Sequence, residues 1–95
     1  MFRIKKIFEN DSIVIHKVEG EVSNGGLSDW ANEIKAVIES SSKQVILEFC
    51  QVSYMSPMAI EVLAHRVNQK TYVMNSPGFI RNMLTTAGLS DHLLD

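Results

Sequence analysis

The spacing of apolar and polar residues divides the chain into short segments with different periods. Apolar and polar residues alternate over 2–8 and again over 13–18, which predicts two strands. The polar pair at 10–11 between them is typical of a tight turn, so we expect a hairpin with 2–8 at the edge of the sheet. Over 27–39 the apolar residues recur every three or four positions, which predicts an amphipathic helix.

The remaining segments repeat a strand and a helix twice. The run 45–49 is mostly apolar, which is typical of a strand covered on both faces. A Ser-Pro pair opens each of the two helices predicted over 56–66 and 76–87, because serine caps free amides and proline suits the first helical position. A strand over 71–75 separates them, and Gly88 stands where a helix C-terminal glycine belongs.

The order of elements is therefore β-β-α-β-α-β-α, which places the chain in the α/β class. Helices between successive strands require crossover connections, and these place the helices over the sheet. A length of 95 residues suits one compact domain. We predict a single domain over 1–95, built on a mixed four-stranded sheet with the helices packed on it.

Composition and charge exclude several classes of function. Nine Lys and Arg stand against eleven Asp and Glu, whereas nucleic-acid modules depend on a basic patch. No apolar stretch reaches the roughly 20 residues that span a bilayer, and the first residues lack the apolar core of a signal peptide. A single cysteine cannot form an internal disulfide. We expect a cytoplasmic domain that neither binds nucleic acid nor inserts into a membrane.

Residues that carry catalysis or bind metals are scattered along the chain. His16, His65 and His92 fall in separate segments, without the spacing of metal ligands. Cys50 follows the apolar strand and has no basic neighbour to activate its thiol, so we interpret it as a small core residue. The carboxylates form no obvious acid–base pair. The sequence predicts a non-catalytic protein without metal or cofactor.

The start of the second predicted helix stands out, with the sequence VSYMSPMA over 52–59. Free amides and the helix dipole make a helix start a natural anion site. Ser56 is most simply the residue that caps this helix, with phosphorylation as the functional alternative. Met55 and Met58 are either core residues or an adaptable contact surface.

The whole chain resembles a STAS domain, the fold shared by bacterial anti-sigma factor antagonists and sulphate-transporter tails. The resemblance rests on the order of elements, on VILEFCQVSYMSPMAIEVL at 45–63 and on NSPGFIRNMLTTAGLSDHL at 75–93. It implies a role in signal transduction and transcription regulation through protein–protein interaction. The implied partner is an anti-sigma factor with serine kinase activity, or a larger signalling assembly.

The resemblance also shows where this chain departs from the family. The family's switch motif, Asp-Ser-Ser/Thr-Gly, matches 56–59, so Met58 occupies the phosphoacceptor position and has no hydroxyl. Ser23 occupies a second, normally acidic, position. The implied module is therefore not switched by phosphate, and Ser56 is the alternative site of phosphorylation. The partner-binding residues that we predict are Ser23, Asn24, Met55, Ser56, Met58 and Glu61.

A second interpretation keeps the fold and changes the role. The domain would then bind a small anion, a nucleotide or a lipid, or regulate a transporter, through backbone amides at Ser56 and Ser76. A ligand that binds only the native state must raise the midpoint of thermal unfolding, which distinguishes this role from protein binding. A small enzyme or metal protein is the third interpretation, and the scattered polar residues favour it least.

Overall fold

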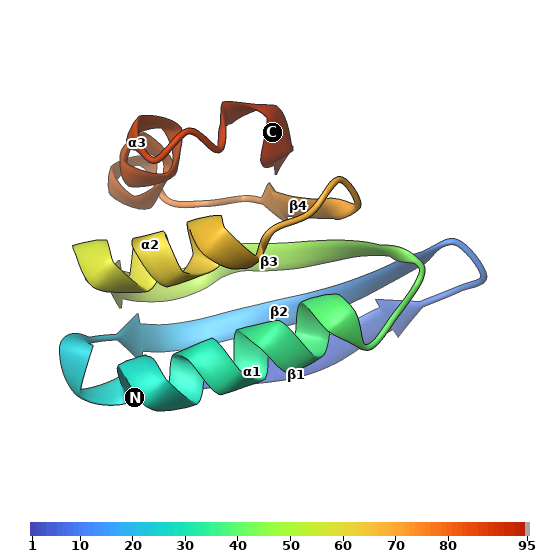
Figure 1. Cartoon of the computed structure of the whole chain (residues 1–95), viewed down its shortest axis with the longest axis horizontal. Helices are drawn as coiled ribbons and strands as arrows, with labels where there is room; N and C mark the ends of the chain where they lie inside the picture. The colour runs from blue at the N-terminus through green and yellow to red at the C-terminus, as the bar shows by residue number, and fades with distance from the viewer. Residues whose placement is uncertain (95) are drawn as a thin grey trace.

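Five strands form one mixed sheet in the computed structural model, which describes residues 1–94. The first two strands pair antiparallel, and every later strand runs parallel to its neighbour (Figure 1). We predicted four strands; the fifth is only two residues long and follows the last helix, too short to show a period. In sheet order the strands are β1 (Phe2–Glu9), β2 (Ile13–Val22), β3 (Gln44–Met55), β4 (Thr71–Met74) and β5 (Leu93–Leu94).

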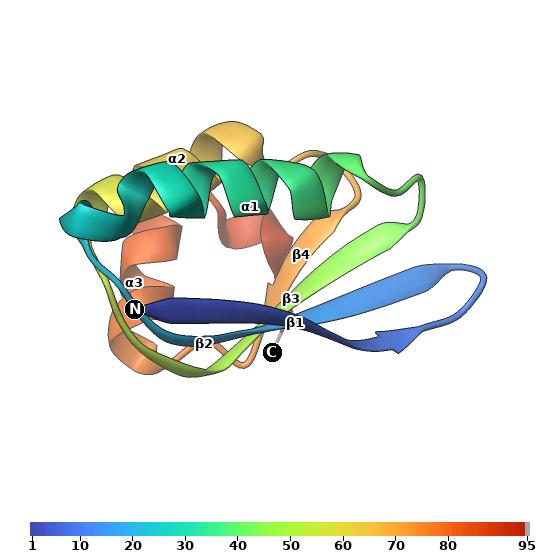
Figure 2. The same ribbon diagram turned by 90° about the horizontal axis from the view of Figure 1, so that it is seen from below.

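Helices connect the parallel strands, as the α/β prediction requires. Figures 1 and 2 show α1 and α2 side by side along one face of the sheet. Two short 3-10 helices, η1 (Asn24–Gly26) and η2 (Ser90–His92), precede α1 and β5. The predicted fold class and the order of elements up to the third helix are confirmed. The helices are α1 (Leu27–Glu39), α2 (Pro57–Arg66) and α3 (Gly78–Thr86).

One hydrophobic core lies between the helices and the inner face of the sheet. Ile80 and Leu84 of α3 belong to the same core as the buried residues of α1 and α2. Trp30, which belongs to the apolar stripe predicted over 27–39, is fully buried there. The largest fully buried side chains are Trp30, Phe49, Ile34, Leu47, Met55, Leu63, Ile80 and Leu84.

The second face of β3 is not covered by helices, so our prediction of a strand covered on both faces is wrong. Val45, Leu47 and Phe49 point into the core, while Ile46 between them is only partly buried. Glu48 is buried although it shares the second face with Ile46. The alternation was hidden because Ile46 is itself apolar, and a strand with apolar residues on its open face has the same pattern as a doubly covered strand.

β2 and β3 continue several residues past their predicted ends. The pairing of the two strands shifts register between Lys17 and Glu19 and again between Gly20 and Glu21. Such irregularities break the period of two that identifies a strand in the sequence. As a result, residues 50–55, which lie between the predicted strand and the predicted helix, belong to β3, and Met55 pairs with Val22 at the end of both strands.

Of our two predictions for the ends of α3, the one for its C-terminal end is confirmed and the one for its start is wrong. After α3, Gly88 adopts φ +89°, and the Leu89 N–H donates to the Leu84 carbonyl oxygen at 3.0 Å. This is the predicted glycine helix end, with buried Leu89 packing back over the last turn. The predicted serine cap at the start is wrong, because Pro77 is the capping residue and makes no side-chain hydrogen bond.

Candidate functional site

The start of α2 is tied to the end of β2 through one serine. The Ser56 hydroxyl oxygen accepts a hydrogen bond from the Ala59 N–H at 3.1 Å, so Ser56 caps α2 as predicted. The Ser56 N–H donates to the Val22 carbonyl oxygen at 2.9 Å. These two hydrogen bonds fix the first turn of α2 at the edge where β2 and β3 end.

A buried tryptophan attaches the same turn of α2 to α1. Trp30 Nε1–H donates to the Ala59 carbonyl oxygen at 3.0 Å. The ring of Phe2 meets the Trp30 ring edge to face, with centroids 5.4 Å apart. The apolar period over 27–39 predicts that this side of α1 is buried but does not predict this hydrogen bond. The available signal was that a buried indole N–H requires an acceptor.

The predicted partner-binding residues separate into an exposed set and a buried set. Met58 is 57% exposed, and Glu61 and Asn24 are also exposed, with Ser23 half-buried. Met55 is 1% exposed and Ser56 is 2% exposed, so neither side chain is open to a partner. Our inclusion of these two as contact residues is corrected: they support the surface from below.

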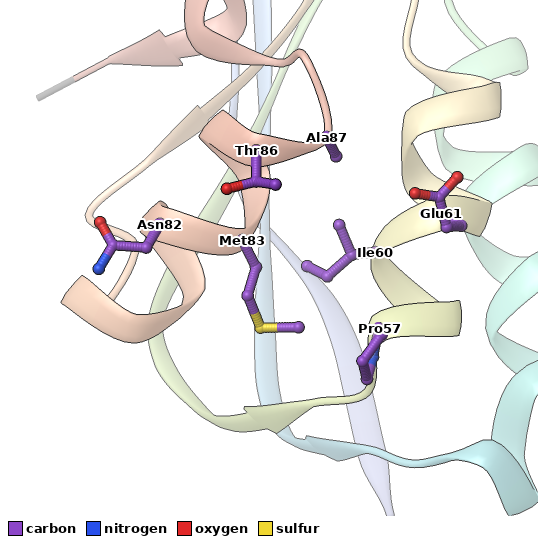
Figure 3. Close-up of a pocket in the computed structure, with 7 residues that line it drawn as sticks. All are labelled: Pro57, Ile60, Glu61, Asn82, Met83, Thr86 and Ala87. Carbon is purple, nitrogen blue, oxygen red and sulfur yellow. The ribbon is translucent and has the colours of Figure 1, made fainter.

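Two grooves flank the exposed side of α2. The first has a volume of about 330 Å³ and lies between α2 and α3. Figure 3 shows Ile60 and Met83 on facing sides of this groove, with Glu61 at its rim. Its walls are mostly apolar, and no local pattern predicts the groove because it depends on how two separate helices pack. The groove is lined by Pro57, Ile60, Glu61, Asn82, Met83, Thr86 and Ala87.

The second groove lies between α1 and α2 and is also about 330 Å³. Met58 and Glu61 line it together with Ala31 of α1 and His65 of α2. Glu61 therefore borders both grooves. We call Pro57, Met58, Glu61 and the two grooves the α2 surface. Ser23 lines a different hollow, with Asp29 and Glu33, and it follows Val22, whose carbonyl oxygen accepts from the Ser56 N–H.

Solved structures with the same arrangement of elements are anti-sigma factor antagonists. Unphosphorylated SpoIIAA superimposes with a TM-score of 0.74 at 17% identity, covering 98% of this chain and 87% of SpoIIAA. An antagonist from Mycobacterium paratuberculosis gives a TM-score of 0.77 at 15% identity, covering 98% and 83%. The phosphorylated Bacillus SpoIIAA gives 0.61 at 16%, covering 98% and 90%. The fold is that of the anti-sigma factor antagonists.

The resemblance to STAS domains is thereby confirmed at the level of the fold. It extends over nearly the whole chain, as the order of elements predicted. No protein-family model matches the sequence, and no curated protein matches it. At 15–17% identity the antagonist fold is what the comparisons establish.

The α2 surface of this antagonist fold carries one exposed carboxylate, that of Glu61. Among residues 1–94, no Lys, Arg or His nitrogen lies within 4.0 Å of the Glu61 carboxylate. The nearby Arg66 pairs instead with Glu39 of α1, at 3.8 Å. His65 Nδ1–H donates to the Glu61 backbone carbonyl oxygen at 2.8 Å and not to the Glu61 side chain. The surface thus combines apolar grooves with the exposed carboxylate of Glu61, and Arg66 of the second groove is paired with Glu39.

The capping role of Ser56 leads to a stability prediction. We expect Ser56→Ala to lower the free energy of unfolding by about 1 kcal/mol, because the Ala59 N–H loses its acceptor. Urea unfolding followed by circular dichroism measures the change. Ser53→Ala, an exposed serine of β3, is the control. Equal urea midpoints for the two variants would show that the Ser56 hydroxyl does not stabilise α2.

Other residues with possible chemistry are dispersed over the antagonist fold. Cys50 is exposed, so its interpretation as a core residue is wrong. A hydrogen bond to Glu48 and the charge of that carboxylate raise the pKa of the Cys50 thiol, which opposes a reactive thiolate. Within residues 1–94, no three His, Cys, Asp or Glu side chains are grouped as a metal site needs. None of the helices there is long and apolar enough to cross a membrane.

Proposed function

We propose that this chain is a non-catalytic regulatory module that binds another protein through the α2 surface, in the cytoplasm. The observation that carries the proposal is the exposure of Met58 beside the groove between α1 and α2, at the start of α2. Exposed apolar groups beside concave apolar surface mark contact sites, and methionine adapts to varied partners. The antagonists that share the fold suggest an anti-sigma factor with serine kinase activity, or a signalling assembly, as the partner.

The proposed module works in a single state. A phosphate at a helix start adds about −1.5 to −2 charges at neutral pH and so changes which partner the surface accepts. Met58 has no hydroxyl to receive one. Ser56 has its hydroxyl engaged with the Ala59 N–H and is 2% exposed, which makes it a poor kinase substrate. The surface is therefore expected to bind its partner constitutively.

We expect Met58→Glu to reduce capture of the partner about tenfold or more, since a buried unpaired charge costs at least about 1–3 kcal/mol. The measurement is affinity capture from the source cell with the whole chain as bait, quantified by mass spectrometry. Phe79→Glu is the matched control, because Phe79 is a 50% exposed side chain at the second position of α3, as Met58 is in α2. A glutamate suits both helix starts equally.

Two outcomes would contradict the proposal. If both variants retain the same partners as the wild type, the α2 surface is not the contact site. If no protein is captured by any of the three baits, a ligand-binding role becomes the better account. A thermal-shift screen with phosphate, nucleotides and lipid headgroups then tests that role, because a bound ligand raises the unfolding midpoint.

A further inference from the structure

The face of the sheet opposite α1 and α2, here called the open face, carries a continuous apolar row. The pairing registers align four residues across four strands: Phe8 of β1, Ile15 of β2, Ile46 of β3 and Tyr72 of β4. Ile15 follows core-facing Val14, so alternation directs Ile15 and the row to the open side. Phe8 is 48% exposed, and the other three are partly buried.

A second row beside it is basic at one end and apolar at the other. It aligns Lys5, Lys17, Glu48, Met74 and Leu94 across all five strands. The two lysines belong to β1 and β2, and the two apolar residues belong to β4 and β5. Met74 and Leu94 therefore extend the apolar surface, while the lysines form a positive border on the hairpin.

Neither Lys5 nor Lys17 forms an ion pair with another described residue, because Glu19 of the same face pairs with Arg3 at 3.0 Å. Lys5 and Lys17 stand directly opposite each other, an arrangement that disfavours the sheet by itself. No carboxylate of residues 1–94 lies within 4.0 Å of either ammonium group. Glu48, the neighbour of Lys17 in register, instead accepts a hydrogen bond from the Asn75 side-chain amide at 3.1 Å. The open face keeps an unpaired positive charge beside its apolar row.

We propose that the open face binds an acidic amphipathic helix of a partner protein. A helix is the natural second layer for an uncovered sheet face, and its apolar side would bury the row from Phe8 to Tyr72. Carboxylates on the edge of that helix would then pair with Lys5 and Lys17. This contact lies on the opposite side of the sheet from α2, so it is independent of the α2 surface.

Charge and shape distinguish this partner from two other occupants. A second copy would present the same two lysines to Lys5 and Lys17, and its open-face carboxylates are already engaged, Glu19 with Arg3 and Glu48 with Asn75. A membrane contact requires several apolar side chains that protrude, whereas in this row only Phe8 is exposed and Ile15 and Ile46 lie partly buried. A helix of a protein can match both the apolar row and the positive border.

The test uses two synthetic helical peptides of about 20 residues, a length that supports a helix in water. Both carry the same leucine face, and their polar faces are glutamate in one and lysine in the other. Each is titrated into the ¹⁵N-labelled whole chain, and amide shifts are followed by NMR. We expect only the glutamate peptide to bind, with the largest shifts at the two rows of the open face.

Lysine variants distinguish charge pairing from non-specific hydrophobic binding. We expect Lys5→Glu combined with Lys17→Glu to weaken binding of the glutamate peptide about tenfold. The control is Lys35→Glu, an exposed lysine of α1 on the other side of the sheet. Lys5→Gln combined with Lys17→Gln provides a milder second variant if the reversal disturbs folding, which the dispersion of the NMR spectrum reports.

Four results would overturn the proposal. These are equal binding of the two peptides, shifts confined to α2 or α3, no binding of the glutamate peptide, and an unchanged affinity in the lysine variants. Concentration-dependent shifts of the same rows without peptide would assign the face to a second copy. Co-sedimentation with anionic phosphatidylglycerol vesicles, lost in the lysine variants, would assign it to a membrane surface. Both assignments replace the helix proposal.

Discussion

Replacing Trp30 with alanine is expected to lower the free energy of unfolding by about 3–5 kcal/mol, the usual cost of removing a large buried aromatic side chain. Trp30 is fully buried and contacts the Phe2 ring edge to face. The total stability of a small domain is roughly 5–15 kcal/mol, so the variant should lose a large share of it. Urea unfolding monitored by circular dichroism measures the change.

A phenylalanine at the same position separates the hydrogen bond from the volume. Trp30→Phe keeps an aromatic ring but leaves the Ala59 carbonyl oxygen without the Nε1–H donor that lies 3.0 Å away. We expect a cost of about 1–3 kcal/mol from that unpaired buried group, together with some lost packing. Ala59 lies in the first turn of α2. Hydrogen exchange in this variant should therefore accelerate more at the α2 amides than at those of β2 and β3.

The control for both Trp30 variants is Tyr54→Ala, which removes an aromatic side chain that is 45% exposed. That change should stay within about 0.5 kcal/mol, as exposed substitutions usually do. A Trp30→Phe variant with the wild-type urea midpoint and unchanged exchange in α2 would mean that the indole hydrogen bond does not hold the first turn of α2.

Local patterns were sufficient for most of the fold. Segment 27–39 shows a three-to-four residue period because one side of α1 is buried and the other is exposed to solvent. The predicted bounds of this helix match the structure. Gly88 marked the end of α3 because few other residues accept a positive φ. The sequence failed where the period is broken or too short, at the register shifts between β2 and β3 and at the two residues of β5.

The candidate site was only half predictable for the same physical reason. Met58 and Glu61 were found because a Ser-Pro helix start is a local signal and they lie on its exposed side. Met55 was misplaced because β3 continues through its irregularities and turns that side chain inward. Met83 and Ala87 were missed because α2 and α3 meet only after the chain has folded.

The second large effect is expected at Gly20, in the part of β2 that pairs with the start of β1. Gly20 adopts φ +91°, a conformation that side chains rarely accept. A Cβ added there would lie 2.4 Å from the Met1 carbonyl oxygen, which already accepts a hydrogen bond from the Glu21 N–H. Neither group can move without separating Phe2 from Gly20 in the sheet.

We therefore expect Gly20→Ala to lower the free energy of unfolding by about 2–3 kcal/mol, at the upper end of the cost of backbone strain. Two other glycines separate the causes. Gly88 has φ +89° with no atom within 4 Å of the added Cβ, so Gly88→Ala measures strain without a clash. Gly25 has neither a positive φ nor a close neighbour, so Gly25→Ala should be nearly neutral.

The order of the three urea midpoints is the decisive result of this series. Gly20→Ala should unfold first, Gly88→Ala next and Gly25→Ala last, because the first variant combines strain with a backbone clash. If Gly20→Ala matches Gly88→Ala, the start of β1 yields at little cost and only the positive φ matters. If Gly20→Ala matches Gly25→Ala, the close approach of Met1 to β2 is not required for stability, and the pairing of Phe2 with Gly20 does not hold the N-terminal end of β1 in place.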